Sequence, residues 1–151
     1  MEIFEDLENM KNCPIEVALN YLGKKWTMQI IRDLFSEKKR FKDFLGSNPQ
    51  ISTKMLSLRL KELQKADLIK KSVISTTPVM IEYSLTQKGK ELNRILFQLA
   101  EFSLKNYPNE VYYKKPKSID LDISNLKRFF KVRISSPIAN LKKDKSTKNN
   151  F

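Results

Sequence analysis

A mainly α-helical fold with one small β-hairpin is predicted by three features of the sequence. Apolar residues recur at helical spacing over most of residues 14–66, strand-like alternation replaces that spacing between residues 68 and 85, and helical spacing then returns up to residue 106. Helices followed by a hairpin and a further helix have the order of a winged helix-turn-helix. We therefore divide the chain into a winged body with its own C-terminal helix, residues 1–108, and a basic, partly disordered extension, residues 109–151.

The N-terminal part of the chain is expected to hold three helices. Residues 2–11 form a short one, and Pro14 suits the first position of the next, which ends at Gly23. The third begins near Lys25. Their apolar stripes are Ile15, Ala18, Leu19 and Leu22, then Trp26, Ile30, Ile31, Leu34 and Phe35, with Lys25, Gln29, Arg32 and Asp33 on the opposite face of the third helix.

Two further helices and the hairpin follow. A short helix over 40–47 ends at the turn residues Gly46-Ser47-Asn48-Pro49, and Ser52 is a plausible N-cap for a helix over 52–66 that buries Leu56, Leu60 and Leu63. Strands are expected over 68–74 and 80–85, joined by a loop over 75–78. Thr86 then caps one long helix over 87–106, and Pro108 ends it.

The extension gives weaker signals. Residues 119–123 alternate like a strand, although Leu126, Phe129, Phe130 and Val132 fit a short helix instead. Residues 141–150 are rich in lysine and asparagine and are expected to be disordered. We expect 119–134 to pack on the body or on a partner subunit; the alternative is that the whole extension is disordered.

The charge points to an anionic partner. The chain carries 29 Lys and Arg against 17 Asp and Glu, a formal net charge of +12. Nucleic acid and anionic membranes are the obvious candidates. No apolar stretch is long enough for a membrane span and the acidic N-terminus lacks the pattern of a signal peptide, so we expect a soluble, cytoplasmic protein that does not bind membranes. A lone cysteine fits a reducing compartment.

Composition also argues against catalysis. The chain has no histidine, one cysteine and three widely separated glycines. These counts leave no nitrogen- or sulfur-ligated metal site, no histidine base for a nucleophile and no glycine-rich phosphate loop. We expect no metal, no cofactor and no enzymatic activity.

The winged order predicts a surface that reads DNA. The helix over 52–66 would lie in the major groove, the helix over 40–47 would position it, and the loop over 75–78 would form the wing. Any amphipathic surface helix exposes lysines, but the element order and net charge together favour this interpretation. Arg59 fits a phosphate contact and a structural ion pair equally well. The predicted DNA-binding residues are Lys39, Arg40, Lys42, Ser52, Thr53, Lys54, Ser57, Arg59, Lys61, Lys70, Lys71, Ser75, Thr76 and Thr77.

Several ordered blocks resemble those of the HxlR-type regulators, winged helix-turn-helix relatives of the MarR group of transcriptional regulators. The resemblance covers roughly residues 13–107. Its blocks are Cys13-Pro14 with LGKKW at 22–26, RFKDF at 40–44, ISTKMLSLRLKEL at 51–63, ADLI at 66–69 and EYSLTQKG at 82–89.

The resemblance implies a homodimer that binds double-stranded, palindromic operator DNA through its reader helix. Terminal helices form the dimer interface in this family, and here they would be the segment before Trp26 and the helix over 87–106. The dimerisation residues would be Leu92, Ile95, Leu96, Leu99 and Phe102. Some relatives use the cysteine at the position of Cys13 to sense oxidants, whereas a buried, inert cysteine is the alternative. Two other interpretations stay open: a winged-helix protein–protein adaptor, and a regulator that responds to a small molecule.

Overall fold

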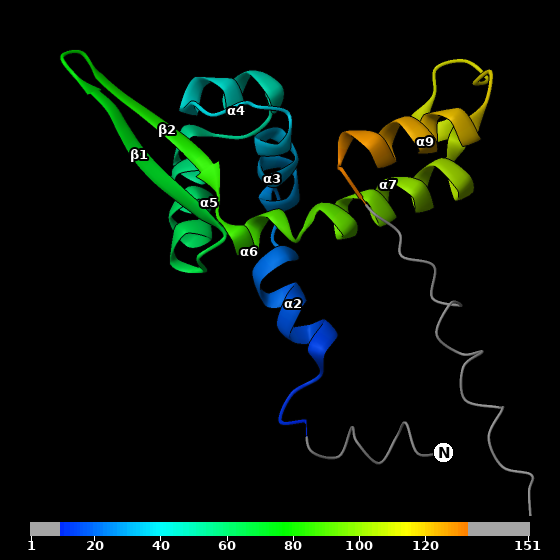
Figure 1. Ribbon diagram of the computed structural model, residues 1–151, viewed down its shortest axis with the longest axis horizontal. Helices are drawn as coiled ribbons and strands as arrows, with labels where there is room; N and C mark the ends of the chain where they lie inside the picture. The colour runs from blue at the N-terminus through cyan, green and yellow to red at the C-terminus, as the bar shows by residue number, and fades with distance from the viewer. Residues whose placement is uncertain (1–9, 133–151) are drawn as a thin grey trace, which may run out of the picture.

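The computed structural model describes residues 10–132, so the lysine-rich segment 141–150 and nearly all of the helix expected over 2–11 lie outside it (Figure 1). The described chain is mostly helical with one two-stranded antiparallel sheet, as predicted. Its elements are α2 (Pro14–Leu22), α3 (Thr27–Phe35), α4 (Phe41–Ser47), α5 (Thr53–Lys65), β1 (Ile69–Thr76), β2 (Val79–Leu85), α6 (Gln87–Lys90), α7 (Asn93–Asn106), α8 (Pro108–Val111) and α9 (Ile119–Phe129).

The core of the winged body lies where α3, α4 and α5 meet the base of the hairpin. Ile30 and Phe44 are fully buried, and the stripe predicted on α5 is buried at Leu56, Leu60 and Leu63. Leu68 and Tyr83 extend this core to the two strands. Burial of apolar surface at about 25 cal/mol per Å² therefore fixes α5 with one face inward and the other facing solvent.

The third helix begins two residues later than predicted. Trp26 has a left-handed backbone (φ 76°) and occupies the N-cap position, so the first residue of α3 is Thr27. A second correction concerns Asp33, which was predicted on the solvent face but is 1% exposed. Asp33 is three residues after Ile30, so it lies at the edge of the buried stripe.

The hairpin is longer than predicted, because β1 runs through Thr76 and β2 starts at Val79. Ser75 and Thr76 therefore pair in the strands, and only Thr77 and Pro78 form the turn. The pairing shifts between Val73 and Ser75, which places a bulge in β1. Figure 1 shows the hairpin projecting from the helical body as a wing.

The single helix predicted over 87–106 is wrong, because the chain breaks between α6 and α7. Glu91 and Leu92 donate to carbonyls three residues back, Lys88 at 3.3 Å and Gly89 at 3.2 Å. This tighter winding interrupts the α-helical repeat. Gly89 is buried against Leu68, so α6 is held on the strands while α7 turns away.

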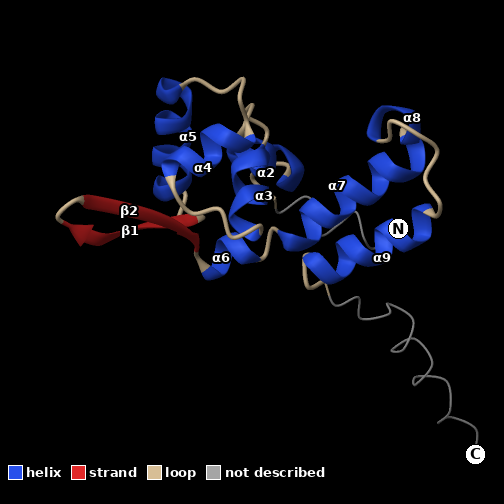
Figure 2. Cartoon of the chain, turned by 90° about the horizontal axis from the view of Figure 1, so that it is seen from above, coloured by secondary structure: helices blue, strands red, loops and turns tan. Residues whose placement is uncertain are grey.

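The strand predicted over 119–123 is also wrong, because these residues begin α9. Ser118 caps the helix by accepting a hydrogen bond from the Leu121 amide at 3.2 Å. Acidic residues fill the first turn and basic residues the last, which suits the helix dipole. In Figure 2, α9 lies alongside α7, away from the wing.

The extension completes the core of the winged body. Phe130 and Val132 are buried, and the Phe130 ring meets Phe35 edge-on with centroids 5.7 Å apart. The Asn93 side chain donates to the Phe130 carbonyl at 3.0 Å. Packing on the body, rather than disorder of the whole extension, is therefore what residues 119–132 show.

Candidate nucleic-acid interface

α5 presents one polar face to solvent from a rigidly held helix. Ser52 is the N-cap predicted from sequence, and its hydroxyl accepts a hydrogen bond from the Met55 amide at 3.1 Å. Thr53, Lys54 and Lys61 are exposed, while Ser57 is half-buried. Among residues 10–132, no carboxylate lies within 4.0 Å of the Lys54 or Lys61 amine. Both ammonium groups are therefore available to an external anion.

Arg59 has a structural role on the same helix. Its side chain is 12% exposed, and it donates to the Lys25 carbonyl at 2.9 Å and to the Glu62 carboxylate at 2.7 Å. Lys24 also pairs with Glu62, at 2.8 Å, and these hydrogen bonds hold the pKa of Glu62 below its usual value. Of the two roles that the sequence left open for Arg59, the structure shows the structural ion pair, which lies within α5. The hydrogen bond from Arg59 to Lys25 and the Lys24–Glu62 pair join α5 to the residues just before α3.

A buried polar network fixes the turn between α4 and α5. The Asn48 amide donates to the Asp33 carboxylate at 2.7 Å and to the Phe44 carbonyl at 3.0 Å. Arg32 donates to the other oxygen of Asp33 at 2.7 Å. Sequence analysis missed this network, although a carboxylate at the edge of an apolar stripe is a signal for it. It joins α3 to the turn before α5 and so positions the helix-turn-helix.

Contacts before α4 connect the helix-turn-helix to the wing. The Tyr83 amide donates to the Lys39 carbonyl at 2.8 Å, and the Arg40 guanidinium lies 3.4 Å from the Glu82 carboxylate. The Lys39 amine lies 3.0 Å from the Glu37 carboxylate, and the hydrogen bond to Glu37 raises the pKa of Lys39. Lys42 is exposed. Contact of Lys39, Arg40 and Lys42 with DNA remains a prediction.

The wing carries its charge only near its base. Lys70 and Lys71 are exposed on β1, but residues 72–81 contain no charged side chain. Val73 and Val79 are 59% and 69% exposed in this outer part. Of the predicted wing contacts, Ser75 is half-buried and Thr76 and Thr77 are exposed. Any ion pair between the wing and an external anion would therefore form at its base.

An apolar face lies between α2 and α7. Of the five predicted dimerisation residues, Leu92 and Leu96 are buried in the subunit's own core. The other three are exposed, and α2, which belongs to the segment before Trp26 that was also predicted at the interface, adds two exposed apolar residues. A groove of about 490 Å³ runs between the two helices. The exposed residues of this apolar face are Ile15, Leu19, Ile95, Leu99 and Phe102.

Cys13 is exposed and directly precedes α2. Residues 10–132 contain no group of three or more side chains that could hold a metal ion. None of the helices in that part of the chain is both long enough and apolar enough to cross a membrane.

Comparisons with known proteins agree with this geometry. The model of the HxlR-like helix-turn-helix family matches residues 21–111, which include the helix-turn-helix, the wing and α7. The chain belongs to the HxlR-like helix-turn-helix family, whose members are winged helix-turn-helix transcriptional regulators. The sequence-based resemblance is thus confirmed.

Individual relatives of this HxlR-like chain support the same assignment. It is 41% identical over 92 residues, 60% of this chain and 85% of the relative, to the uncharacterized HTH-type transcriptional regulator YvaP of Bacillus subtilis. The structure of reduced YodB, a B. subtilis transcriptional regulator, matches 64% of this chain and 95% of YodB, with 36% identity and a TM-score of 0.56. The reduced redox regulator HypR matches 66% of this chain and all of HypR, with 32% identity and a TM-score of 0.60.

Proposed function

We propose that this HxlR-like regulator binds double-stranded operator DNA in a sequence-specific manner, with α5 in the major groove. The outward face of α5 carries this proposal. Thr53 and Ser57 are short enough to approach base edges closely, and Lys54 and Lys61 reach guanine acceptors or phosphate. The buried leucine stripe and the Arg59 contacts hold that face in one orientation, as direct readout of bases requires.

The wing has a different role in this proposal. Lys70 and Lys71 at its base contact phosphate, whereas the uncharged outer part contacts sugars or the minor groove. Phosphate contacts set the register of the protein on DNA without reading sequence. The same face argues against a protein–protein adaptor, because an adaptor has no need for unpaired lysines beside small hydroxyl side chains.

Substitutions on α5 test this role. Lys54→Ala and Ser57→Ala should each weaken binding to a selected operator by about 1–3 kcal/mol if they read bases. The two variants should fold normally, because neither side chain is buried. Fluorescence anisotropy with operator and random duplexes measures both affinities. Lys115→Ala removes an exposed lysine from the loop before α9 and is the matched control. Operator affinities equal to that of the control would contradict the assignment of α5.

We also propose that the protein is a homodimer joined through the apolar face of α2 and α7. Exposed leucine and isoleucine side chains line one groove, and Phe102 is exposed on α7. Such a surface is unfavourable in water, and a second copy would cover it by a twofold contact. A dimer also presents two copies of α5, which matches a palindromic operator. Leu99 lies at the centre of this face on α7.

Leu99→Glu should therefore convert the dimer into a monomer. A buried, unpaired carboxylate at the contact costs several kcal/mol, which raises the dimer dissociation constant by two or more orders of magnitude, at roughly 1.4 kcal/mol for each factor of ten. Sedimentation equilibrium at micromolar concentration measures the change. Leu121→Glu introduces the same charge at a 58% exposed position of α9 and should remain dimeric. A wild-type monomer under these conditions would contradict the proposal.

A thiol-responsive regulator is the second candidate function. Cys13 is exposed at the start of α2, where the proposed dimer contact begins. HypR, a structural relative, is described as a redox regulator. An oxidant effector would act at Cys13 by joining it to a second thiol in a disulfide. Because the chain has one cysteine, a second protein thiol would be the Cys13 of another subunit.

A further inference from the structure

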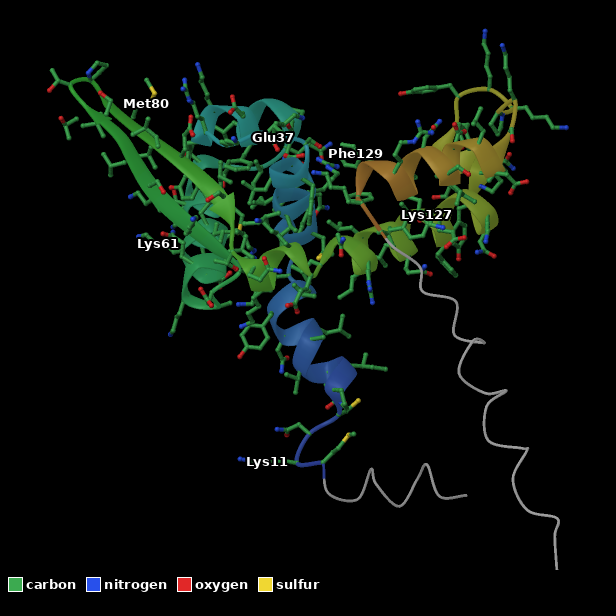
Figure 3. All side chains as sticks on the ribbon, in the orientation of Figure 1. Lys11, Glu37, Lys61, Met80, Lys127 and Phe129 are labelled. Carbon is green, nitrogen blue, oxygen red and sulfur yellow. The ribbon has the colours of Figure 1, made fainter. Side chains whose placement is uncertain are left out.

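A cavity unrelated to the α5 face opens where four parts of the chain meet. Its volume is about 540 Å³, and it is bordered by the loop between α3 and α4, the base of the wing, the junction of α6 and α7, and the end of α9. Phe35, Leu85 and Phe129 supply apolar wall. Figure 3 shows two of its lining residues, Glu37 and Phe129, near one another on the loop and on α9. The volume is typical of small-molecule sites.

Four lysines from separate elements line the same cavity. Lys39 comes from the α3–α4 loop, Lys70 from β1 and Lys90 from α6. Lys131 lies two residues after the end of α9. Glu37 is the only acidic residue of 10–132 that lines the cavity, and it pairs with Lys39. Within residues 10–132, no carboxylate lies within 4.0 Å of the amines of the other three lysines.

Helix ends reduce this positive charge but do not cancel it. α3 and α9 end at the cavity, at Phe35 and Phe129, while α6 ends at Lys90 and α7 begins at Asn93, two ends whose dipole charges have opposite sign. Each C-terminus contributes roughly half a negative charge. Three lysines without carboxylate partners therefore outweigh about one negative charge in total, and the cavity is a cationic site with apolar walls.

We propose that this cavity binds an amphipathic organic anion, of the class of aromatic carboxylates and sulfonates. The ring would pack on Phe129 and Leu85, and the acidic group would lie among Lys70, Lys90 and Lys131. An inorganic anion would leave the apolar wall unused, and a neutral apolar ligand would leave the lysines unpaired. The site depends on residues 129–131, which lie outside the family-matched region 21–111.

Occupancy of the cavity would affect the proposed DNA-binding surface. Tyr83 and Lys39 both line it, and the hydrogen bond between them joins the wing to the loop before α4. A ligand that changes this contact changes the position of the wing relative to α5. By thermodynamic linkage, DNA and ligand would then alter each other's affinity by the same factor. Only this coupling rests on the proposed function, because binding to the cavity can be measured without DNA.

The test uses 8-anilinonaphthalene-1-sulfonate, an aromatic sulfonate whose fluorescence rises in apolar sites, and the full-length protein without DNA. Amide NMR shifts during the titration locate the bound probe. Lys90→Gln with Lys131→Gln removes two of the ammonium groups. Lys115→Gln with Lys117→Gln makes the same change of charge in the exposed loop before α9. Phe129→Ala removes apolar wall without a change of charge.

We expect the largest amide shifts at residues 83–85, 93 and 129–131. The Lys90/Lys131 variant should bind the probe about tenfold more weakly, and the control should match the wild type. Phe129→Ala should also weaken binding. Equal affinities in the two lysine variants would overturn the proposal, as would shifts confined to the groove between α2 and α7. An effect of the probe on operator affinity tests the coupling separately, so its absence would leave the site itself intact.

Discussion

Gly89→Ala is expected to lower the free energy of unfolding by about 3 kcal/mol or more, because no side chain fits between α6 and β1. A Cβ at this position would overlap the Leu68 carbonyl oxygen and lie 3.0 Å from the Leu68 carbonyl carbon. That oxygen also accepts hydrogen bonds from Thr86, from its amide at 3.1 Å and its hydroxyl at 3.2 Å. The substitution would therefore push α6 off the wing base and break the Thr86 contacts.

Gly46→Ala is the matched control, since it makes the same chemical change in an open position. An added Cβ at Gly46 meets no atom of the described chain within 4 Å, and the residue lies inside α4. Alanine has the higher helix propensity, so this variant should be more stable by about 0.5–1 kcal/mol. Urea denaturation followed by circular dichroism measures both changes. Similar midpoints for the two variants would show that the close approach at Gly89 does not limit stability.

Asp33→Ala is expected to destabilise the fold by about 2–4 kcal/mol. Asp33 is 1% exposed and accepts hydrogen bonds from Asn48 and Arg32. Its loss would remove one acceptor from the buried Asn48 amide and leave a small cavity beside α3. Because Asn48 lies in the turn before α5, the variant should also loosen that turn. Faster amide hydrogen exchange over residues 48–53 would report this local effect.

Glu101→Ala provides the control for Asp33, because it also removes a carboxylate from an ion pair. Its partner Lys105 is 55% exposed, so the pair is screened by water. The expected loss is about 0.5 kcal/mol or less. If Asp33→Ala cost no more than Glu101→Ala in the same denaturation experiment, the buried network would not hold the turn.

The sequence predicts the winged body well where the signals are local. Helical spacing identifies the leucine stripe of α5, and Ser52 identifies its N-cap. The alternating residues of β1 and β2 identify the hairpin. These predictions succeed because each element buries one face. The spacing of the apolar residues along the sequence identifies that face.

Most of the failures depend on contacts between distant residues. Asp33 looks like a surface charge until the fold brings Asn48 beside it, and the choice between the two roles of Arg59 needs the contact with Lys25. The break between α6 and α7 follows from the contact of Gly89 with Leu68, 21 positions away in the chain. In α9, acidic and apolar residues alternate as in a strand, and the Ser118 cap, a local signal, identifies the helix. The partners of Asp33 and Gly89, by contrast, have no local signature.

Selection of bound duplexes from a random library tests the central claim most directly. The full-length protein is incubated with the library at physiological salt, and the bound fraction is amplified and sequenced over several rounds. A dimer with α5 of each subunit in the major groove should enrich an inverted repeat whose half-sites are about one helical turn apart. In a parallel selection, Lys54→Ala should relax the preference within each half-site, whereas Lys115→Ala should enrich the wild-type motif. Enrichment of no motif by the wild type, or of the same motif by Lys54→Ala, would contradict sequence recognition through α5.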